Sequence, residues 1–354
     1  MPRVEQTDWL ATFVAVVDHG SFSEAARALH RSQSRVSTHV AALERALGGL
    51  LIDRTHRPIG PTELGTTFLP HARAVLEALE RGVEAVDQHT GTLRGRVVIG
   101  CHPSVSAGFL PGVIASVHAR HPQVRVELTE HTTPDLVSGI VSGRFNIAIH
   151  SLAADPPSED LQSVALWTER YVVVVPADHE LARAWDAHAH PGPGDASDPT
   201  DPADPAPSGA APSLRGGPAG GGLDPAAVAR HPLIAVARPG AEVDPDTGSA
   251  LRAWGLEIPV AWQTEQPQTV VNLARAGLGV GVLNSLAARI SDTDGMAVVP
   301  VGTLAEGRRV AVTRDRRTIA SPSVDVVFDA IVSTSPPAGV RPHRAHTAEL
   351  PSSS

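Results

Sequence analysis

The chain has 354 residues, a hydrophobic content of 42% and a formal net charge of −9 at pH 7. This length exceeds that of one small domain, and the composition is that of a globular protein. The sequence contains no uncharged apolar run of about 18 residues or more and no secretion signal at its amino end, and a single cysteine excludes an internal disulfide. We therefore expect a cytoplasmic protein of two or three domains that makes no contact with a membrane.

The first predicted elements are two short helices separated by a tight turn, within residues 21–48. Ser21 can cap the first helix, with Glu24 completing a capping box, and Ser32 can cap the second. Gly48 then ends the second helix. Apolar residues at three- and four-residue steps predict the buried face of this second helix: Val36, Val40, Leu43 and Leu47.

The opposite face of the second helix carries side chains rich in hydrogen-bond donors. At the start of a recognition helix, such side chains contact base edges and phosphates in the major groove. The alternative is a structural helical domain with a solvated polar face. We expect the residues of this face to bind DNA: Ser32, Gln33, Ser34, Arg35, Ser37, Thr38 and His39.

A basic hairpin is predicted directly after these helices. Residues 50–53 and 58–60 can form two short strands, which leave Arg54 and Arg57 where they reach the flanking minor groove or its phosphates. The negative net charge does not exclude DNA binding, because acidic residues concentrate later, as in 195–204. Arginines crowd the predicted DNA-binding region: Arg27, Arg31, Arg35, Arg45, Arg54 and Arg57.

A further set of residues follows one ordered pattern with unbroken spacing: Leu10, Phe13, Ser21, Phe22, Ala25, Ala26, Leu29, Ser32, Gln33, Ser37, Leu43, Glu44, Gly48, Leu51, Arg54, Thr62 and Gly65. In these residues the amino-terminal region resembles the DNA-binding domain of the LysR-type transcriptional regulators. The resemblance implies a winged helix-turn-helix over residues 1–61. The chain departs from the family pattern at Ile52, where the family usually has Phe.

Residues 62–90 predict a long helix that joins this domain to the rest of the chain. Its apolar residues repeat about every three and a half positions, the period of a seam between two helices. We expect a dimerising linker, because one DNA-binding unit covers only half a site; packing against its own domain is the alternative. Pro70 is expected to bend or delay the helix. The seam consists of Phe68, Ala72, Val75, Leu79 and Val86.

Beyond residue 96, strand-like and helical segments alternate. This order predicts a mainly parallel sheet with helices on both faces, so the fold class is α/β overall with an all-α amino-terminal domain. The first predicted segments are a strand at 96–100, a helix at 104–120, a strand at 124–128, a helix at 134–142 and a strand at 145–149. Later segments are strands at 171–175, 296–301 and 309–313 and helices at 268–276 and 324–333.

Residues 96–335 also resemble the effector domain of the same family, which implies two lobes with a periplasmic-binding-protein-like fold. The best matches are Leu110-Pro111, His121-Pro122, Gly143 and the glycine-rich stretch 276–283. We expect lobe I at about 96–161 and 281–335, and lobe II at about 162–280. The insertion at 186–222 and the tail at 336–354 are expected to be disordered, because they contain too little apolar material to bury.

Ligands of open α/β sheets bind at the carboxyl ends of strands, where helix N-termini point inward. Hydroxyl groups at such helix starts suit an oxyanion, so an anionic metabolite is the favoured effector; simple helix capping is the alternative. Convergence of His102, His131 and His150 would suit a metal, and Cys101 a redox sensor, but 17 histidines make chance placement the simpler reading and Cys101 has no second thiol to resolve it. We therefore expect no metal and no cofactor. The expected effector-binding residues are His102, Ser104, Ser106, Thr132, Thr133, His150 and Gln266.

Nothing in the sequence indicates catalysis. Gly277, Gly279 and Gly281 follow a predicted helix and enter a strand, which is the reverse of a dinucleotide-binding turn. A nucleophile elbow is also missing from the sequence.

The expected function is a sequence-specific DNA-binding transcriptional regulator that is switched by a small molecule bound between the lobes. Its expected partners are double-stranded DNA, the effector and further copies of itself in a dimer or tetramer, with RNA polymerase left open. The alternative is a small-molecule-binding or enzymatic α/β protein in which the helix-turn-helix only serves docking or oligomerisation.

Overall fold

A computed structural model gives the fold of most of the chain. Arg57, most of the expected insertion and the end of the expected tail lie outside the residues that it describes. The described residues are 7–56, 58–89, 93–152, 160–189, 222–237, 245–255, 260–303, 307–316 and 321–343.

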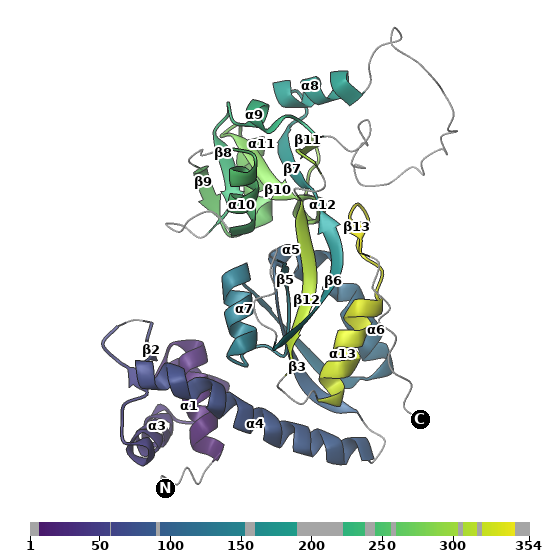
Figure 1. Cartoon of the computed structure of the whole chain (residues 1–354). Helices are drawn as coiled ribbons and strands as arrows, with labels where there is room; N and C mark the ends of the chain where they lie inside the picture. The colour runs from purple at the N-terminus through teal and green to yellow at the C-terminus, as the bar shows by residue number, and fades with distance from the viewer. Residues whose placement is uncertain are drawn as a thin grey trace.

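The amino-terminal domain contains three helices and a two-stranded hairpin (Figure 1). The predicted caps are present, since the Ser21 and Ser32 hydroxyls accept hydrogen bonds at the starts of two helices and Gly48 ends the second with φ of 77°. The expected capping box is incomplete, because the Glu24 carboxylate pairs with the Arg27 guanidinium on its own helix instead of turning back. The elements are α1 (Thr7–His19), α2 (Phe22–Ala28), α3 (Gln33–Leu47), β1 (Ile52–Asp53) and β2 (Gly60–Pro61).

Helix α4 (Glu63–His89) leads away from this domain. Pro70 lies inside it, yet the helix is one continuous element, so the expected delay does not occur. The missing N–H of proline removes a single bond, to the carbonyl of Thr66, while the bonds on both sides remain.

Lobe I is built on a six-stranded sheet with the order β13-β6-β12-β5-β3-β4. Strand β3 pairs in parallel with β4 and β5, whereas β12 runs antiparallel to β5 and β6. The strands are β3 (Arg94–Cys101), β4 (Gln123–Glu130), β5 (Ile147–Ser151), β6 (Leu161–Glu169), β12 (Arg308–Asp315) and β13 (Arg341–Pro342). The helices are α5 (Pro103–Gly108), α6 (Leu110–Arg120), α7 (Thr133–Val141) and α13 (Pro322–Ser333).

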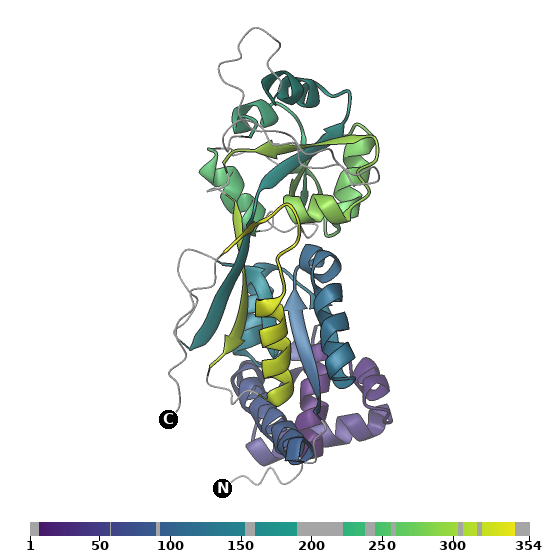
Figure 2. The ribbon, with the colours of Figure 1, turned by 90° about the vertical axis from the view of Figure 1, so that its right-hand side faces the viewer.

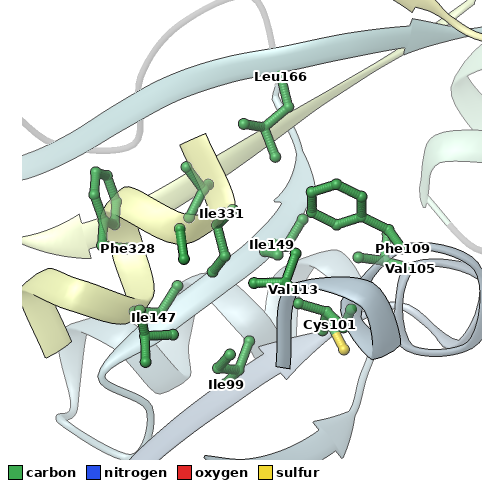
Figure 3. Packing of buried hydrophobic residues seen from close by; sticks show 14 of the residues in the cluster. Ile99, Cys101, Val105, Phe109, Val113, Ile147, Ile149, Leu166, Phe328 and Ile331 are labelled. Atoms are coloured by element: carbon green, nitrogen blue, oxygen red, sulfur yellow. The ribbon is translucent and has the colours of Figure 1, made fainter. Parts of the chain in front are cut away.

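The single helix expected at 104–120 is two helices that meet at Phe109. Phe109 leaves the helical conformation with φ of −130°, and Pro111 favours the start of a new helix. The Phe109 ring packs edge-on against Trp167 with centroids 4.8 Å apart. Figure 3 shows that Phe109 belongs to the main core of lobe I, beside Val105, Val113 and Ile149.

Lobe II is built on a five-stranded sheet with the order β11-β7-β10-β8-β9. Figure 2 shows the two lobes stacked end to end, with the amino-terminal domain and α4 beyond lobe I. The strands are β7 (Tyr171–Pro176), β8 (Leu233–Val236), β9 (Val260–Thr264), β10 (Val280–Asn284) and β11 (Met296–Val301). The helices are α8 (Glu180–Ala189), α9 (Pro225–Val228), α10 (Pro245–Ala253), α11 (Pro267–Arg275) and α12 (Ser285–Ile290).

The α/β fold class is confirmed, but the boundaries of the lobes differ from the expectation. Strand β6 belongs to the sheet of lobe I, and β10 and β11 belong to that of lobe II. The chain therefore crosses between the lobes after Glu169 and returns before Arg308.

Two segments expected to be disordered contain regular structure. Residues 186–189 end helix α8, and Arg341–Pro342 adds strand β13 to the exposed edge of β6. The backbone N–H of His343 donates to the Leu166 carbonyl at 3.0 Å, and its ring lies 2.7 Å from the Thr168 hydroxyl. The outer edge of β6 has backbone N–H and C=O groups with which a later segment can pair. Amino-acid composition does not reveal such pairing.

Within the described ranges, none of the helices has both the length and the apolar character that crossing a bilayer requires. Over the same part of the chain, no three His, Cys, Asp or Glu side chains are grouped so that they could hold a metal ion.

Candidate functional site

The first turns of α3 present a polar surface. Arg35 and Thr38 are exposed, as are the residues that open the helix, and Ser37 is half-buried. The Thr38 hydroxyl donates to the Ser34 carbonyl at 2.9 Å. The exposed members of the predicted DNA-binding set on α3 and its cap are Ser32, Gln33, Ser34, Arg35 and Thr38.

The prediction for His39 is wrong, because its side chain is only 9% exposed. Its Nδ1 lies 3.0 Å from the Thr12 hydroxyl on α1 and 3.3 Å from the Arg31 guanidinium. His39 follows Val36 by three positions, so it falls on the packed side of the helix. The sequence patterns did not predict that α1 packs against the buried side of α3.

The hairpin is fixed to α3 by Glu44. This carboxylate is buried and accepts hydrogen bonds from the backbone N–H groups of Leu51 and Ile52 at 2.9 and 3.2 Å. Arg54 lies 3.5 Å from the same carboxylate and 4.9 Å above the ring of Phe22, with about half of its side chain exposed. Arg57 lies outside the described residues. Glu44 belongs to the matching family pattern, but its role in holding the hairpin was not predicted.

The apolar seam expected along α4 divides into two parts. Phe68 and Ala72 pack into the core of the amino-terminal domain, as the alternative interpretation held for them. The other three seam residues, together with Val83, are exposed by 49 to 66% and form an uncovered stripe: Val75, Leu79, Val83 and Val86.

A cavity of about 270 Å³ lies between the two lobes. It opens at the carboxyl ends of β3 and β4 in lobe I and of β8 and β10 in lobe II, so its place agrees with the rule used for the sequence. The residues from lobe I are His102, Pro103, Ser104, Glu130, His131, Thr132 and Arg308. Those from lobe II are Tyr171, Val236, Ala237, Thr247, Glu265, Gln266, Pro267, Val282, Leu283, Asn284 and Ala287.

Four of the seven expected effector residues line this cavity: His102, Ser104, Thr132 and Gln266. Thr133 does not line the cavity, but its hydroxyl is 3.0 Å from Nε2 of the cavity residue His102. Ser106 hydrogen-bonds to Cys101 instead.

His150 was expected at the cavity and lies elsewhere. Strand β5 continues through Ser151, so His150 sits inside the sheet rather than after it. Its Nδ1 is 2.7 Å from the Ser151 carbonyl and its Nε2 is 2.9 Å from the Thr313 hydroxyl. Of the three histidines considered for a shared cleft, His102 and His131 line the cavity and His150 does not.

Arg308 is a cavity residue that the sequence analysis missed. Its side chain is 4% exposed and donates to the Ser104 hydroxyl at 3.2 Å and to the Glu169 carboxylate at 3.2 and 3.3 Å. Glu169 is fully buried and also accepts from the Trp167 indole N–H at 2.8 Å. This ion pair joins the two crossover strands, β6 and β12. Its partners are far apart in sequence, so no local pattern marks it.

Burial sets the protonation of two groups near the cavity. Desolvation lowers the pKa of His102 well below its ordinary value, and the nearby Arg308 and His150 lower it further, so the ring is neutral at pH 7. Desolvation also raises the pKa of Cys101 to about 12, aided by the Glu130 carboxylate. Figure 3 shows the Cys101 sulfur among apolar side chains, where it is a protonated thiol.

Comparison with known proteins identifies the family. A model described as "LysR substrate binding domain" matches residues 90–191 and 211–335, and one described as "Bacterial regulatory helix-turn-helix protein, lysR family" matches residues 7–66. The chain belongs to the LysR family. The two matches cover the amino-terminal domain and both lobes, but not strand β13.

Individual LysR relatives match about half of the chain. A "Probable hydrogen peroxide-inducible genes activator" of Mycobacterium avium is 35% identical over 173 residues, which are 49% of this chain and 55% of the relative. The "HTH-type transcriptional regulator ShiR" of Corynebacterium glutamicum (strain R) is 35% identical over 175 residues, 49% of this chain and 59% of the relative. Thus the matched part spans less than two thirds of these relatives.

The fold of a solved LysR-type protein extends over nearly the whole chain. A full-length OxyR variant from Pseudomonas aeruginosa has a TM-score of 0.65 at 20% identity and covers 97% of this chain and 99% of that chain. At this identity the likeness concerns the fold alone. It agrees with the two-lobed architecture built on two separate sheets.

Proposed function

We propose that this chain is a sequence-specific DNA-binding transcriptional regulator whose action on DNA is controlled by a small molecule bound in the interlobe cavity. The observation that carries the proposal is the exposed polar start of α3, capped by Ser32 and held beside a wing. In this geometry the side chains of the first turns enter the major groove. The proposal assigns no catalytic step to the chain, and it places the protein where chromosomal DNA is, in the cytoplasm.

Arg35 and Arg54 have different roles in the proposed complex. Arg35 is exposed on the first turn of α3, where a guanidinium can form a bidentate pair with guanine or bind a phosphate. Arg54 is oriented by Glu44 and Phe22, which favours a fixed contact to the phosphate backbone beside the groove. Gln33 and Ser34 complete the set that reads the bases.

The uncovered stripe on α4 supports self-association. Four apolar side chains 49 to 66% exposed on one helix are costly in water, and a second copy of the helix would cover them. Pairing through this stripe would bring two DNA-binding domains together on two half-sites. We propose a dimer as the smallest active unit, with a tetramer formed by further contacts between effector domains.

A chain of contacts links the cavity to the DNA-binding domain. His102 in the cavity wall is hydrogen-bonded to Thr133 at the start of α7. At the end of the same helix, Ser142 accepts two hydrogen bonds from Arg73 of α4, and Arg73 also pairs with Asp18 of α1. Movement of α7 on ligand binding would therefore reach α4 and α1 without passing through a loop.

Sensing of peroxide by a thiol is not part of the proposal, although several relatives are named hydrogen peroxide-inducible genes activators. A peroxide-reactive cysteine needs an accessible thiolate. Cys101 is fully buried, and its pKa is raised to about 12. The cavity is the better candidate for the effector site.

Footprinting on the DNA upstream of the gene for this protein tests the proposal. The full chain should protect a defined segment with two half-sites, and Arg35→Ala should weaken protection about tenfold. Arg120→Ala is a matched control, because Arg120 is an exposed arginine on α6 of lobe I. The alternative, in which the helix-turn-helix only serves docking, predicts no protected segment and no difference between the two variants.

A further inference from the structure

The chain adds a short strand to lobe I beyond the end of the matched family domain. The LysR substrate-binding model ends at residue 335, whereas the structure describes the chain as far as His343. Strand β13 lies in this extension and pairs with the outer edge of β6. We call residues 336–343 the strap. Its role follows from its own contacts, because the family domain does not include it.

The strap pairs with the last residues of β6, where the chain leaves lobe I. Arg341 lies opposite Thr168, and Pro342 lies opposite Trp167. Strand β6 then ends at Glu169. Figure 1 shows β13 beside this end of β6, at the level where the two lobes meet. The strap therefore contacts one of the two crossovers that must bend when the angle between the lobes changes.

The strap is fixed to an irregular point of β6. The residue pairs between β6 and β12 skip Leu166, which marks a β-bulge, and a bulge bends a strand and disrupts its ladder. The backbone N–H of His343 donates to the carbonyl of this same Leu166 at 3.0 Å, and Nε2 of His343 lies 2.7 Å from the Thr168 hydroxyl. Val340 packs against the main core of lobe I. The strap thus supports β6 where its pairing with β12 is interrupted.

The same strand closes the sheet against further pairing. Backbone N–H groups of consecutive residues in a strand point to opposite sides, and the N–H of His343 points to β6. Pro342 therefore stands where an N–H group would face outward, which is the place that proline tolerates in an edge strand. A strand of another chain would find no donor at this residue. This favours a role of the strap within the protein over that of a docking edge.

The residues of β6 beside the strap hold part of the wall of the interlobe cavity. The Trp167 indole N–H donates to the Glu169 carboxylate at 2.8 Å, and Glu169 pairs with Arg308, which lines the cavity. All three side chains are buried, so bending of β6 would break contacts that water does not replace. A strap that keeps the end of β6 in register therefore keeps this ion pair in place.

We propose that the strap is a positioning element for the effector site. As a third strand beside β6 and β12, it restricts the angle between the lobes and holds the Glu169–Arg308 pair in the cavity wall. His343 is its positioning residue, because it bonds to β6 through both its backbone and its ring. This inference rests on the proposed function, which makes the cavity the effector site.

Distances between spin labels on the two lobes test this proposal. Cys101 is fully buried, so labels attach to cysteines introduced at exposed positions, by Ala119→Cys on α6 and Ala184→Cys on α8. Pulsed electron paramagnetic resonance, with the labelled chain diluted into unlabelled parent chain, gives the distribution of the distance within one protomer. In a chain that ends after Ser335, this distribution should be about twofold wider than in the full chain. A chain that ends after His343 is the matched control, because it keeps the strap and should keep the narrow distribution.

Point variants separate a role in the hinge from a simple loss of stability. His343→Ala removes the ring contact to Thr168 and should widen the distribution in part. His343→Gln should restore the parent width, since its amide can reach the same hydroxyl. Arg341→Ala is the matched control in the same strand, because the Arg341 side chain is exposed. Circular dichroism checks that each variant is folded and gives its melting temperature.

The outcomes separate this inference from the proposed function. An unchanged distribution in the chain that ends after Ser335 would overturn the role of the strap, even with a lower melting temperature, because the strap would then only stabilise lobe I. If that chain does not fold, an unchanged distribution in His343→Ala overturns it instead. Failure of the unlabelled full chain to protect its upstream DNA would count against the proposed function, whereas the distances between the lobes would still decide whether the strap restricts the hinge.

Discussion

Arg73 and Ser142 connect the linker helix to lobe I. Arg73 donates to both the carbonyl and the hydroxyl oxygen of Ser142, each at 3.2 Å, and the same guanidinium pairs with Asp18 at the end of α1. The Arg73 side chain is 7% exposed, and burial lowers its pKa while the Asp18 carboxylate opposes the change. One buried cation thus joins the DNA-binding domain, α4 and the effector domain.

Asp18→Asn should destabilise the protein by about 2 kcal/mol, because it removes the carboxylate that pairs with a buried guanidinium. Urea unfolding followed by circular dichroism measures the change in the free energy of unfolding. Ser142→Ala is the matched control, since it keeps the backbone carbonyl as an acceptor and should cost less than half as much. Equal stability of Asp18→Asn and the parent chain would show that the contact carries no weight.

His39 and Arg35 lie on the same helix and should respond to mutation in opposite ways. His39→Ala removes the buried contact to Thr12 and should lower the free energy of unfolding by about 1 to 2 kcal/mol. Its DNA affinity, measured well below the unfolding temperature, should stay within about twofold. Arg35→Ala should keep full stability and lose about tenfold in affinity. A reversal of these two profiles would mean that the buried and exposed faces of α3 are assigned wrongly.

Local patterns predicted most of the amino-terminal domain. Ser21, Ser32 and Gly48 act within one turn of their own helices, so their chemistry can be read from short windows of sequence. His39 was misplaced because its environment depends on α1, which packs across the helix from a distant part of the chain. The spacing of His39 from Val36 marks the packed side of α3, but it does not show that α1 covers the side chain there.

The interlobe site was predictable in place but not in detail. The rule on strand ends led to His102, Ser104, Thr132 and Gln266, all of which line the cavity. Two long-range contacts were not predicted. They are the Arg308–Glu169 ion pair, whose partners are 139 positions apart in sequence, and the pairing of β13 with β6. The preference for an anionic effector rests on the hydroxyl groups at the helix starts, and it stays a prediction.

Gly65 should not tolerate even a methyl group. A Cβ at this position would lie 2.1 Å from the carbonyl oxygen of Leu51, where the wing packs against the start of α4. Gly65→Ala should therefore destabilise the amino-terminal domain by about 2 kcal/mol or more. Gly82→Ala, in the same helix but with open space around it, should stabilise the protein by about 0.5 to 1 kcal/mol. Thermal unfolding of the two variants checks both signs, and a neutral Gly65→Ala would contradict the packing at this junction.

Cys101 should be inert in the folded protein. Its thiol is fully buried in the core of lobe I, and its pKa is raised to about 12, so almost no thiolate forms at pH 7.5. Iodoacetamide or hydrogen peroxide should leave Cys101 unmodified in the native protein. Both reagents should modify it fully in about 8 M urea, which unfolds most domains. Intact-protein mass spectrometry measures the extent of modification.

The same shift of the Cys101 pKa has a consequence for stability at high pH. Because the folded state holds the proton more tightly, the thiol contributes its full stability below the ordinary pKa of 9.0 and loses it as the pH rises toward about 12. Cys101→Ala should flatten this fall, at a cost of about 1 kcal/mol at pH 7 for the lost packing. Rapid alkylation of native protein at pH 7.5, together with loss of the DNA footprint under peroxide, would instead make Cys101 a redox sensor and return the effector question to thiol chemistry.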